Sequence, residues 1–154
     1  MGRMKDAFVD GGIVVDRAIG FWINRVLTAS RLEMYRRFRE EGEEITPEQW
    51  AVLIRLWEND GVTQTALSEA TFRDKPTMSR IVDSMEKHGL VERRVDAADA
   101  RARLIHLTRR GRALRTKLVP VAEAIVTRMT RGIDPEALET TRESLRRMFA
   151  NLTE

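Results

Sequence analysis

Residues 74–87 combine short hydroxyl side chains with long cations, a mixture suited to hydrogen bonding with nucleic acid. The candidates near the start of this segment are Lys75, Pro76, Thr77, Ser79 and Arg80. An arginine can donate two hydrogen bonds to one guanine, whereas hydroxyl groups and lysine reach bases or phosphates. We therefore expect Arg80, with Thr77 and Ser79, to read bases and Lys75 to contact the phosphate backbone. The alternative is that these side chains only solvate an exposed helix face.

The opposite side of the same segment is apolar with helical spacing, since Met78, Ile81, Val82 and Met85 recur at i, i+3, i+4 and i+7. Gly89 provides a typical end for this helix. Thr63 caps a shorter helix that comes before it, and a turn at 71–73 leads to the cap at Asp74. The pattern predicts a helix-turn-helix in which Thr65, on the short helix, is a further phosphate anchor.

After Gly89 the period changes from helical to alternating. Residues 91–95 and 103–107 read as two short strands, so the segment between them is the tip of a hairpin. A basic hairpin directly after a helix-turn-helix predicts a wing. For Arg93, Arg94 and Arg103, phosphate contact and protection of a strand edge by charge are equally open.

The hairpin tip carries Arg101, which we expect to enter the minor groove of DNA, where narrow A·T-rich stretches attract guanidinium groups. Asp99 lies two residues earlier. Because a carboxylate repels phosphate, its expected role is to orient Arg101. The alternative is a charged, mobile hairpin without a role in DNA binding.

Long helical patterns flank this block. One runs over 13–39, a second helix begins at the capping box of Thr46 and Gln49, and two more follow from Thr108 and Asp134. The first and last patterns carry more apolar surface than a small lobe can cover, which favours a dimer. The residues that could instead line a pocket for an aromatic ligand, although large side chains at this spacing are more often core, are Trp22, Ile23, Trp50 and Leu53.

Composition narrows the function classes. The segment 73–117 holds 13 basic and 6 acidic residues, whereas the rest of the 154-residue chain holds 14 and 18. This asymmetry favours a polyanionic partner such as DNA. Absence of cysteine, only two histidines and no apolar run of membrane length argue against disulfides, sulfur-based metal sites, most acid–base catalysis and a membrane anchor. We expect a cytoplasmic protein that is not an enzyme and needs no metal or cofactor.

Three motifs resemble the multiple-antibiotic-resistance regulator (MarR) family of bacterial transcription factors. They are residues 74–80, residues 88–94, and Asp99-x-Arg101 followed by Leu107-Thr108-x-x-Gly111. The resemblance implies a winged-helix homodimer with intertwined first and last helices, and many such proteins lose DNA affinity when a small, often aromatic, ligand binds. Ala100 departs from the pattern, which usually has a basic residue there.

The sequence thus predicts a mainly α fold with a small β-hairpin wing. Within a single domain, 1–154, a winged helix-turn-helix lobe spans 45–111, and 10–44 with 112–154 form long N- and C-terminal dimerisation helices. The predicted function is a homodimeric repressor of a pseudopalindromic operator in double-stranded DNA, relieved by a small-molecule effector. The alternative is an architectural DNA-binding protein without sequence specificity, or a module that binds an acidic protein.

Overall fold

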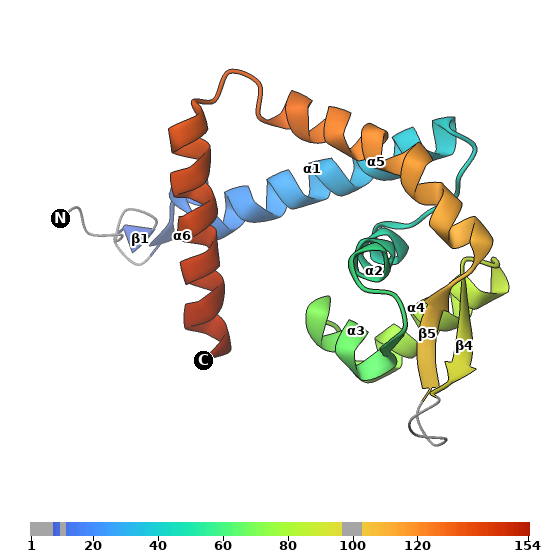
Figure 1. Cartoon of the computed structure of the whole chain (residues 1–154). Helices are drawn as coiled ribbons and strands as arrows, with labels where there is room; N and C mark the ends of the chain where they lie inside the picture. The colour runs from blue at the N-terminus through green and yellow to red at the C-terminus, as the bar shows by residue number, and fades with distance from the viewer. Residues whose placement is uncertain (1–7, 10–11, 97–102) are drawn as a thin grey trace.

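The computed structural model describes residues 8–9, 12–96 and 103–154, which form helices joined to short strands (Figure 1). In chain order the elements are β1 (Phe8–Val9), β2 (Gly12–Ile13), the 3-10 helix η1 (Val15–Arg17), α1 (Ile19–Glu40), α2 (Pro47–Glu58), β3 (Val62–Thr63), α3 (Gln64–Ala70), α4 (Lys75–Lys87), β4 (Val91–Val95), β5 (Arg103–Leu107), α5 (Arg109–Met129) and α6 (Pro135–Thr153).

The elements form two parts. A winged lobe consists of α2, α3, α4 and an antiparallel sheet with the strand order β3-β5-β4. A helical arm consists of α1 and α5, which run side by side, and of α6, which runs down from the far end of α5 and across the direction of α1 and α5 (Figure 1). The predicted mainly α fold with a hairpin wing is confirmed. Among the described residues, no helix combines the length and apolar character needed to cross a membrane.

The helices of the lobe begin where their capping residues predict. The side chains of Thr46, Thr63, Asp74 and Thr108 each accept a hydrogen bond from the backbone N–H three residues later, at 2.8–3.2 Å. At Thr46 the side chain of Gln49 also accepts from the Thr46 N–H at 3.0 Å, which completes the predicted capping box. These local interactions explain why the boundaries could be predicted.

The start of the first long helix was predicted wrongly. It was expected at residue 13, but α1 begins at Ile19, after η1 and the extended residue Ala18. The β-branched run at 13–15 disfavours a helix, and Ala18 offers no side-chain cap. Instead, the Trp22 indole donates to the Asp16 carbonyl at 2.8 Å and holds η1 against α1.

The sheet has a third strand that the sequence did not reveal. In β3, Val62 pairs with Ile105 and Thr63 with Leu104. Just before it, the Asp60 carboxylate accepts a hydrogen bond from the Leu107 backbone N–H at 2.8 Å. The strand therefore ties the loop between α2 and α3 to the centre of the wing.

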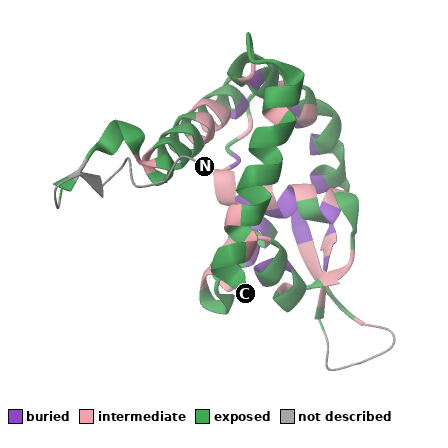
Figure 2. Cartoon of the chain, turned by 90° about the vertical axis from the view of Figure 1, so that its left-hand side faces the viewer, coloured by how far each residue is buried: buried purple, intermediate pink, exposed green. Residues whose placement is uncertain are grey.

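The core lies in the lobe and in the adjoining ends of α1 and α5, as the buried residues in Figure 2 show. The α4 side chains Met78, Val82 and Met85 are fully buried, as their spacing predicts. Phe38 of α1 packs on Trp50 of α2 with ring centroids 4.9 Å apart. In contrast, no residue of α6 is buried within this chain.

One junction connects the recognition part of the lobe to the arm. Gly89, with φ of 67°, ends α4, and the Leu90 N–H donates to the Met85 carbonyl at 2.9 Å. The Thr108 hydroxyl donates to the Gly89 carbonyl at 2.6 Å, and the Thr108 N–H donates to the Leu90 carbonyl at 3.1 Å. The end of α4 and the start of α5 are therefore joined by backbone contacts.

Gly111→Ala is expected to destabilise this junction, because the added Cβ would lie 2.1 Å from the Leu90 carbonyl oxygen. Such overpacking typically lowers the free energy of unfolding by about 1–3 kcal/mol, measurable by urea denaturation. Gly20→Ala is the matched control: nothing lies within 4 Å of its added Cβ, inside helix α1. The control is expected to gain up to ~1 kcal/mol. Wild-type stability in Gly111→Ala would contradict the close approach.

Candidate nucleic-acid interface

The exposed start of α4 carries a connected set of polar groups. The Asp74 carboxylate accepts hydrogen bonds from the Thr77 backbone N–H and from the Thr77 hydroxyl, both at 2.8 Å. The Arg80 guanidinium, exposed one turn further along, donates to the same hydroxyl at 3.5 Å. Asp74 and Thr77 therefore help to orient the Arg80 side chain on the exposed face of α4.

The hydrogen bonds from Thr77 also affect the protonation state of the Asp74 carboxyl group. The two hydrogen bonds from Thr77 hold the pKa of Asp74 below its usual range, and Arg80 adds to the effect. Asp74 is therefore a carboxylate at neutral pH and accepts a hydrogen bond from the Thr77 hydroxyl. The free lone pair of Thr77 then acts as an acceptor, which suits the amino group of adenine or cytosine in the major groove.

The remaining predicted contacts surround this helix start. Lys75 and Pro76 are exposed and Ser79 is half-buried. Thr65 is exposed on α3, and it borders the same open hollow of about 550 Å³ as Lys75. The structure thus brings the helix-turn-helix candidates to one side of the lobe.

A second hollow, of about 300 Å³, separates α4 from the start of α2, with Thr77 and Arg80 among its lining residues. Across it the Gln49 side-chain amide donates to the Ser84 hydroxyl at 3.2 Å. Gln49 is buried, so Ser84 serves the contact between helices rather than the outer face.

Arg93 fastens the wing to the recognition helix, a role that the sequence analysis missed. Its guanidinium donates to Asp83 of α4 at 2.5 Å and pairs with Glu86 of α4 as well. Its backbone N–H also donates to Glu86, at 3.2 Å. Burial alone would lower the pKa of Arg93, but these acidic partners outweigh it and raise the pKa, so the cation persists.

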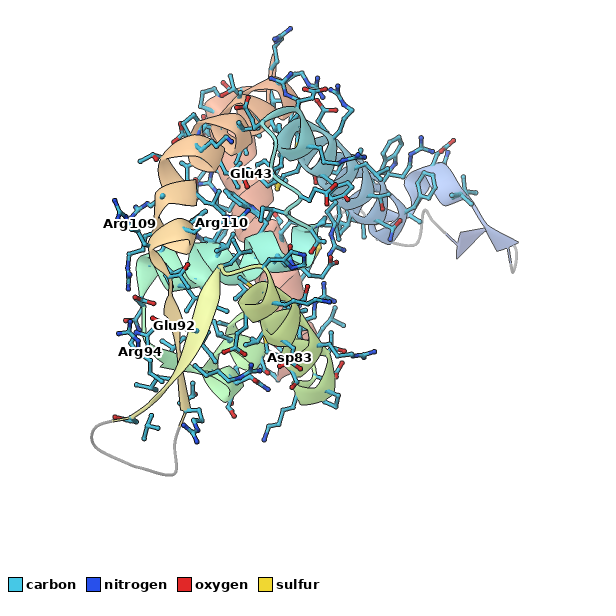
Figure 3. The ribbon with its side chains drawn as sticks, turned by 90° about the vertical axis from the view of Figure 1, so that its right-hand side faces the viewer. Glu43, Asp83, Glu92, Arg94, Arg109 and Arg110 are labelled. Carbon is cyan, nitrogen blue, oxygen red and sulfur yellow. The ribbon has the colours of Figure 1, made fainter. Side chains whose placement is uncertain are left out.

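The alternation of residues along β4 could have indicated that Arg93 contacts α4. Arg93 alternates in phase with Val91, which is buried, and so its side chain points to the covered face of β4. Arg94 points to the other face and pairs with Glu92 on the outside of the wing (Figure 3). Arg103 is exposed on β5. Asp99 and Arg101 lie outside the described residues, so their predicted roles remain predictions.

The four candidate ligand contacts fall into two groups that the structure does not bring together. Trp22 and Ile23 are exposed near the start of α1. Trp50 packs on Phe38 near the opposite end of that helix, and Leu53 is fully buried in the lobe core. These four residues therefore do not line a single pocket within one chain.

The described residues give no sign of a metal centre, since no three His, Asp or Glu side chains among them gather into a group that could hold an ion. What they do form is a helix-turn-helix with a basic hairpin fastened to its second helix. This arrangement defines a winged-helix DNA-binding protein.

Comparisons with known proteins agree with this class. Residues 44–102 match the MarR family. The transcriptional regulator HosA of Escherichia coli is 30% identical over 113 residues, covering 73% of this chain and 84% of HosA. A probable transcriptional regulator from Pseudomonas aeruginosa superposes with a TM-score of 0.77 at 29% identity, over 87% of this chain and 98% of its own. CouR from Rhodococcus jostii, solved bound to p-coumaroyl-CoA, superposes with a TM-score of 0.77 at 26% identity, over 88% of this chain and 94% of CouR.

The chain belongs to the MarR family of transcriptional regulators. The predicted resemblance is confirmed, and so is the expectation of a regulator rather than an enzyme.

Alanine substitutions of the two neighbouring arginines are expected to separate their roles. Arg93→Ala removes a side chain that is only 26% exposed and breaks two ion pairs to α4, so unfolding should become easier by about 1 kcal/mol. Arg94→Ala, on the outer face, should change the free energy of unfolding by less than about 0.5 kcal/mol.

If Arg94 contacts phosphate, its removal should also reduce the slope of log binding constant against log salt by about 0.9, measured on random duplex DNA. An unchanged slope would show that Arg94 only protects the strand edge. Equal stability of the two variants would refute the fastening role of Arg93.

Proposed function

We propose that this regulator is a homodimeric repressor in the cytoplasm that binds a pseudopalindromic operator and is released by a small effector. The observation that carries the proposal is the polar start of α4, where Thr77 and Arg80 are ordered by Asp74 beside the wing. In winged proteins this helix enters the major groove, and its first residues reach base edges. Arg80 is our candidate for bidentate recognition of guanine.

The apolar surface of the helical arm supports a dimer. Most residues of α1 and α6 are exposed (Figure 2), and several of them are large and apolar. These residues are Ile19, Trp22, Ile23, Val26, Leu27, Leu145, Phe149 and Leu152. A second copy related by a two-fold axis would cover them and would place two recognition helices on half-sites about 34 Å apart.

The effector is proposed to be a small aromatic molecule that binds where the arm faces the lobe. CouR, a similar protein by fold and sequence, was solved bound to p-coumaroyl-CoA, whose acyl group is aromatic, and this supports an aromatic ligand. Trp22 and Ile23 lie on the proposed dimer face and remain candidate contacts for a ligand bound beside that face, whereas Trp50 and Leu53 would require the core to open. A ligand that prefers one spacing of the recognition helices would shift the population away from the DNA-binding state.

Arg80→Ala is expected to weaken binding to the operator by ~1–3 kcal/mol and binding to random duplex much less. The operator would first be selected from genomic DNA, and both affinities measured by titration at one fixed salt concentration. Lys87→Ala, at the exposed far end of α4, is the control that should affect both duplexes alike. Equal losses for Arg80→Ala on operator and random DNA would contradict base reading and favour binding without sequence specificity.

The dimer is tested by placing a charge on the apolar face of α1. Val26 is 50% exposed there, and Val26→Asp should dissociate the dimer and abolish tight operator binding, because the charge would be buried without a partner. Asn24→Asp adds the same charge at another exposed position of α1 and should leave both unchanged. Sedimentation and operator titration measure the outcome; a Val26→Asp protein that stays dimeric would rule out this face as the interface.

A further inference from the structure

The turn between α3 and α4 contains an unusual residue. Phe72 has φ of 53°, the left-handed conformation that bulky side chains rarely adopt. Its N–H donates to the Glu69 carbonyl at 3.1 Å, and the Arg73 N–H donates to the Ser68 carbonyl at 2.9 Å. This pair of bonds is the Schellman motif, whose left-handed position usually holds glycine.

At two other helix ends in this chain, glycine occupies the left-handed position of the Schellman motif. Gly42 after α1 and Gly89 after α4 take the equivalent position, with φ of 79° and 67° and the same pair of backbone bonds. Phe72 therefore brings backbone strain that a glycine would avoid. Its side chain is also 70% exposed, so burial in the lobe core does not compensate for the strain.

Within the described part of the chain, the ring of Phe72 has one aromatic neighbour, and it comes from the helical arm. Phe149 of α6 meets Phe72 edge to face, with ring centroids 5.4 Å apart and an angle of 73° between the rings. No residue of α6 is buried within this chain, so α6 has little other packing against the lobe. The ring pair therefore links this helix of the arm to the helix-turn-helix. Figures 1 and 2 show α6 running down beside the lobe toward this turn.

We infer that Phe72 is a positioning residue that connects α6 to the recognition helix. Phe72 stands two residues before Asp74, the cap that fixes the start of α4, so a shift of α6 that carries Phe72 also moves the start of α4. In the proposed dimer α6 belongs to the interface, and the ring pair thereby sets the distance between the two reading helices. The inference rests on the proposed function for its link to the operator, while the ring contact itself does not depend on it.

Phe72→Gly separates this role from a purely structural one. Glycine relieves the strain, so the variant should unfold at the same temperature as the wild type or higher. Hydrogen exchange of the last turns of α6 should nevertheless become faster, because the helix loses its contact with the lobe. Unchanged exchange in α6 would overturn the inference, whether or not the protein binds an operator.

The DNA readout uses operators whose half-sites are moved apart or together by single base pairs. The wild type should bind one spacing best, whereas Phe72→Gly should lose about tenfold on that spacing and discriminate less among the others, a coupling of ordinary size between two sites. Phe149→Ala should give the same result, and the double variant should lose no more than either single one. Additive losses would mean that the two rings act separately and would refute the inference.

Two controls complete the experiment. Phe149→Tyr keeps the ring and should bind like the wild type, whereas Asn151→Ala removes an exposed polar side chain from the same helix, outside the proposed interface, and should leave the spacing preference intact. Sedimentation is run on every variant at the concentration used for binding, so that loss of the dimer is not mistaken for loss of positioning. A wild type that prefers no operator would refute the proposed function, and the exchange of α6 would still decide the inference.

Discussion

The close approach of Gly111 to the Leu90 carbonyl is the constraint on which the arrangement of the two parts depends. At this point the end of α4, the start of β4, the end of β5 and the start of α5 meet within a few residues. A side chain at 111 would separate them, and the Trp57 indole adds a hydrogen bond to the Gly111 carbonyl at 3.0 Å. The direction in which the arm leaves the lobe is therefore fixed by backbone contacts.

The features predicted correctly from sequence are those that local chemistry determines. Caps such as Thr46 and Asp74 satisfy N–H groups a few residues away, so their signal survives without knowledge of the fold. The strand β3 could not be predicted, because its two residues gain their partners from β5, more than forty positions later. The grouping of Trp22 with Trp50 failed for the same reason: spacing shows that each lies on a helix, but not which ends of the helices meet.

The charge count also needs the structure to be interpreted. Several cations of the basic segment serve internal contacts: Arg93 joins the wing to α4, and Arg110 and Lys117 of α5 pair with Glu43 at 3.3 and 3.0 Å (Figure 3). Arg112 pairs with Asp60 at 2.8 Å. Burial would raise the pKa of Asp60, but the Leu107 N–H and Arg112 outweigh it and lower the pKa, so this link persists at neutral pH. The excess of charge in the segment thus overstates the charge left to face DNA.

These contacts leave the two ends of α4 held in different ways. Its last turn is fixed to α5 through the junction, whereas its first turn follows the strained turn at Phe72. From Lys75 to Lys87 the helix is about 18 Å long at ~1.5 Å per residue. A rotation of ~10° about the fixed end would move the first turn by about 3 Å, which exceeds the tolerance of a hydrogen bond to a base edge. Because Met78 ties the first turn to the lobe core, such a rotation would carry the whole lobe about the junction. A small change in the arm would therefore be sufficient to alter recognition while the lobe core stays intact.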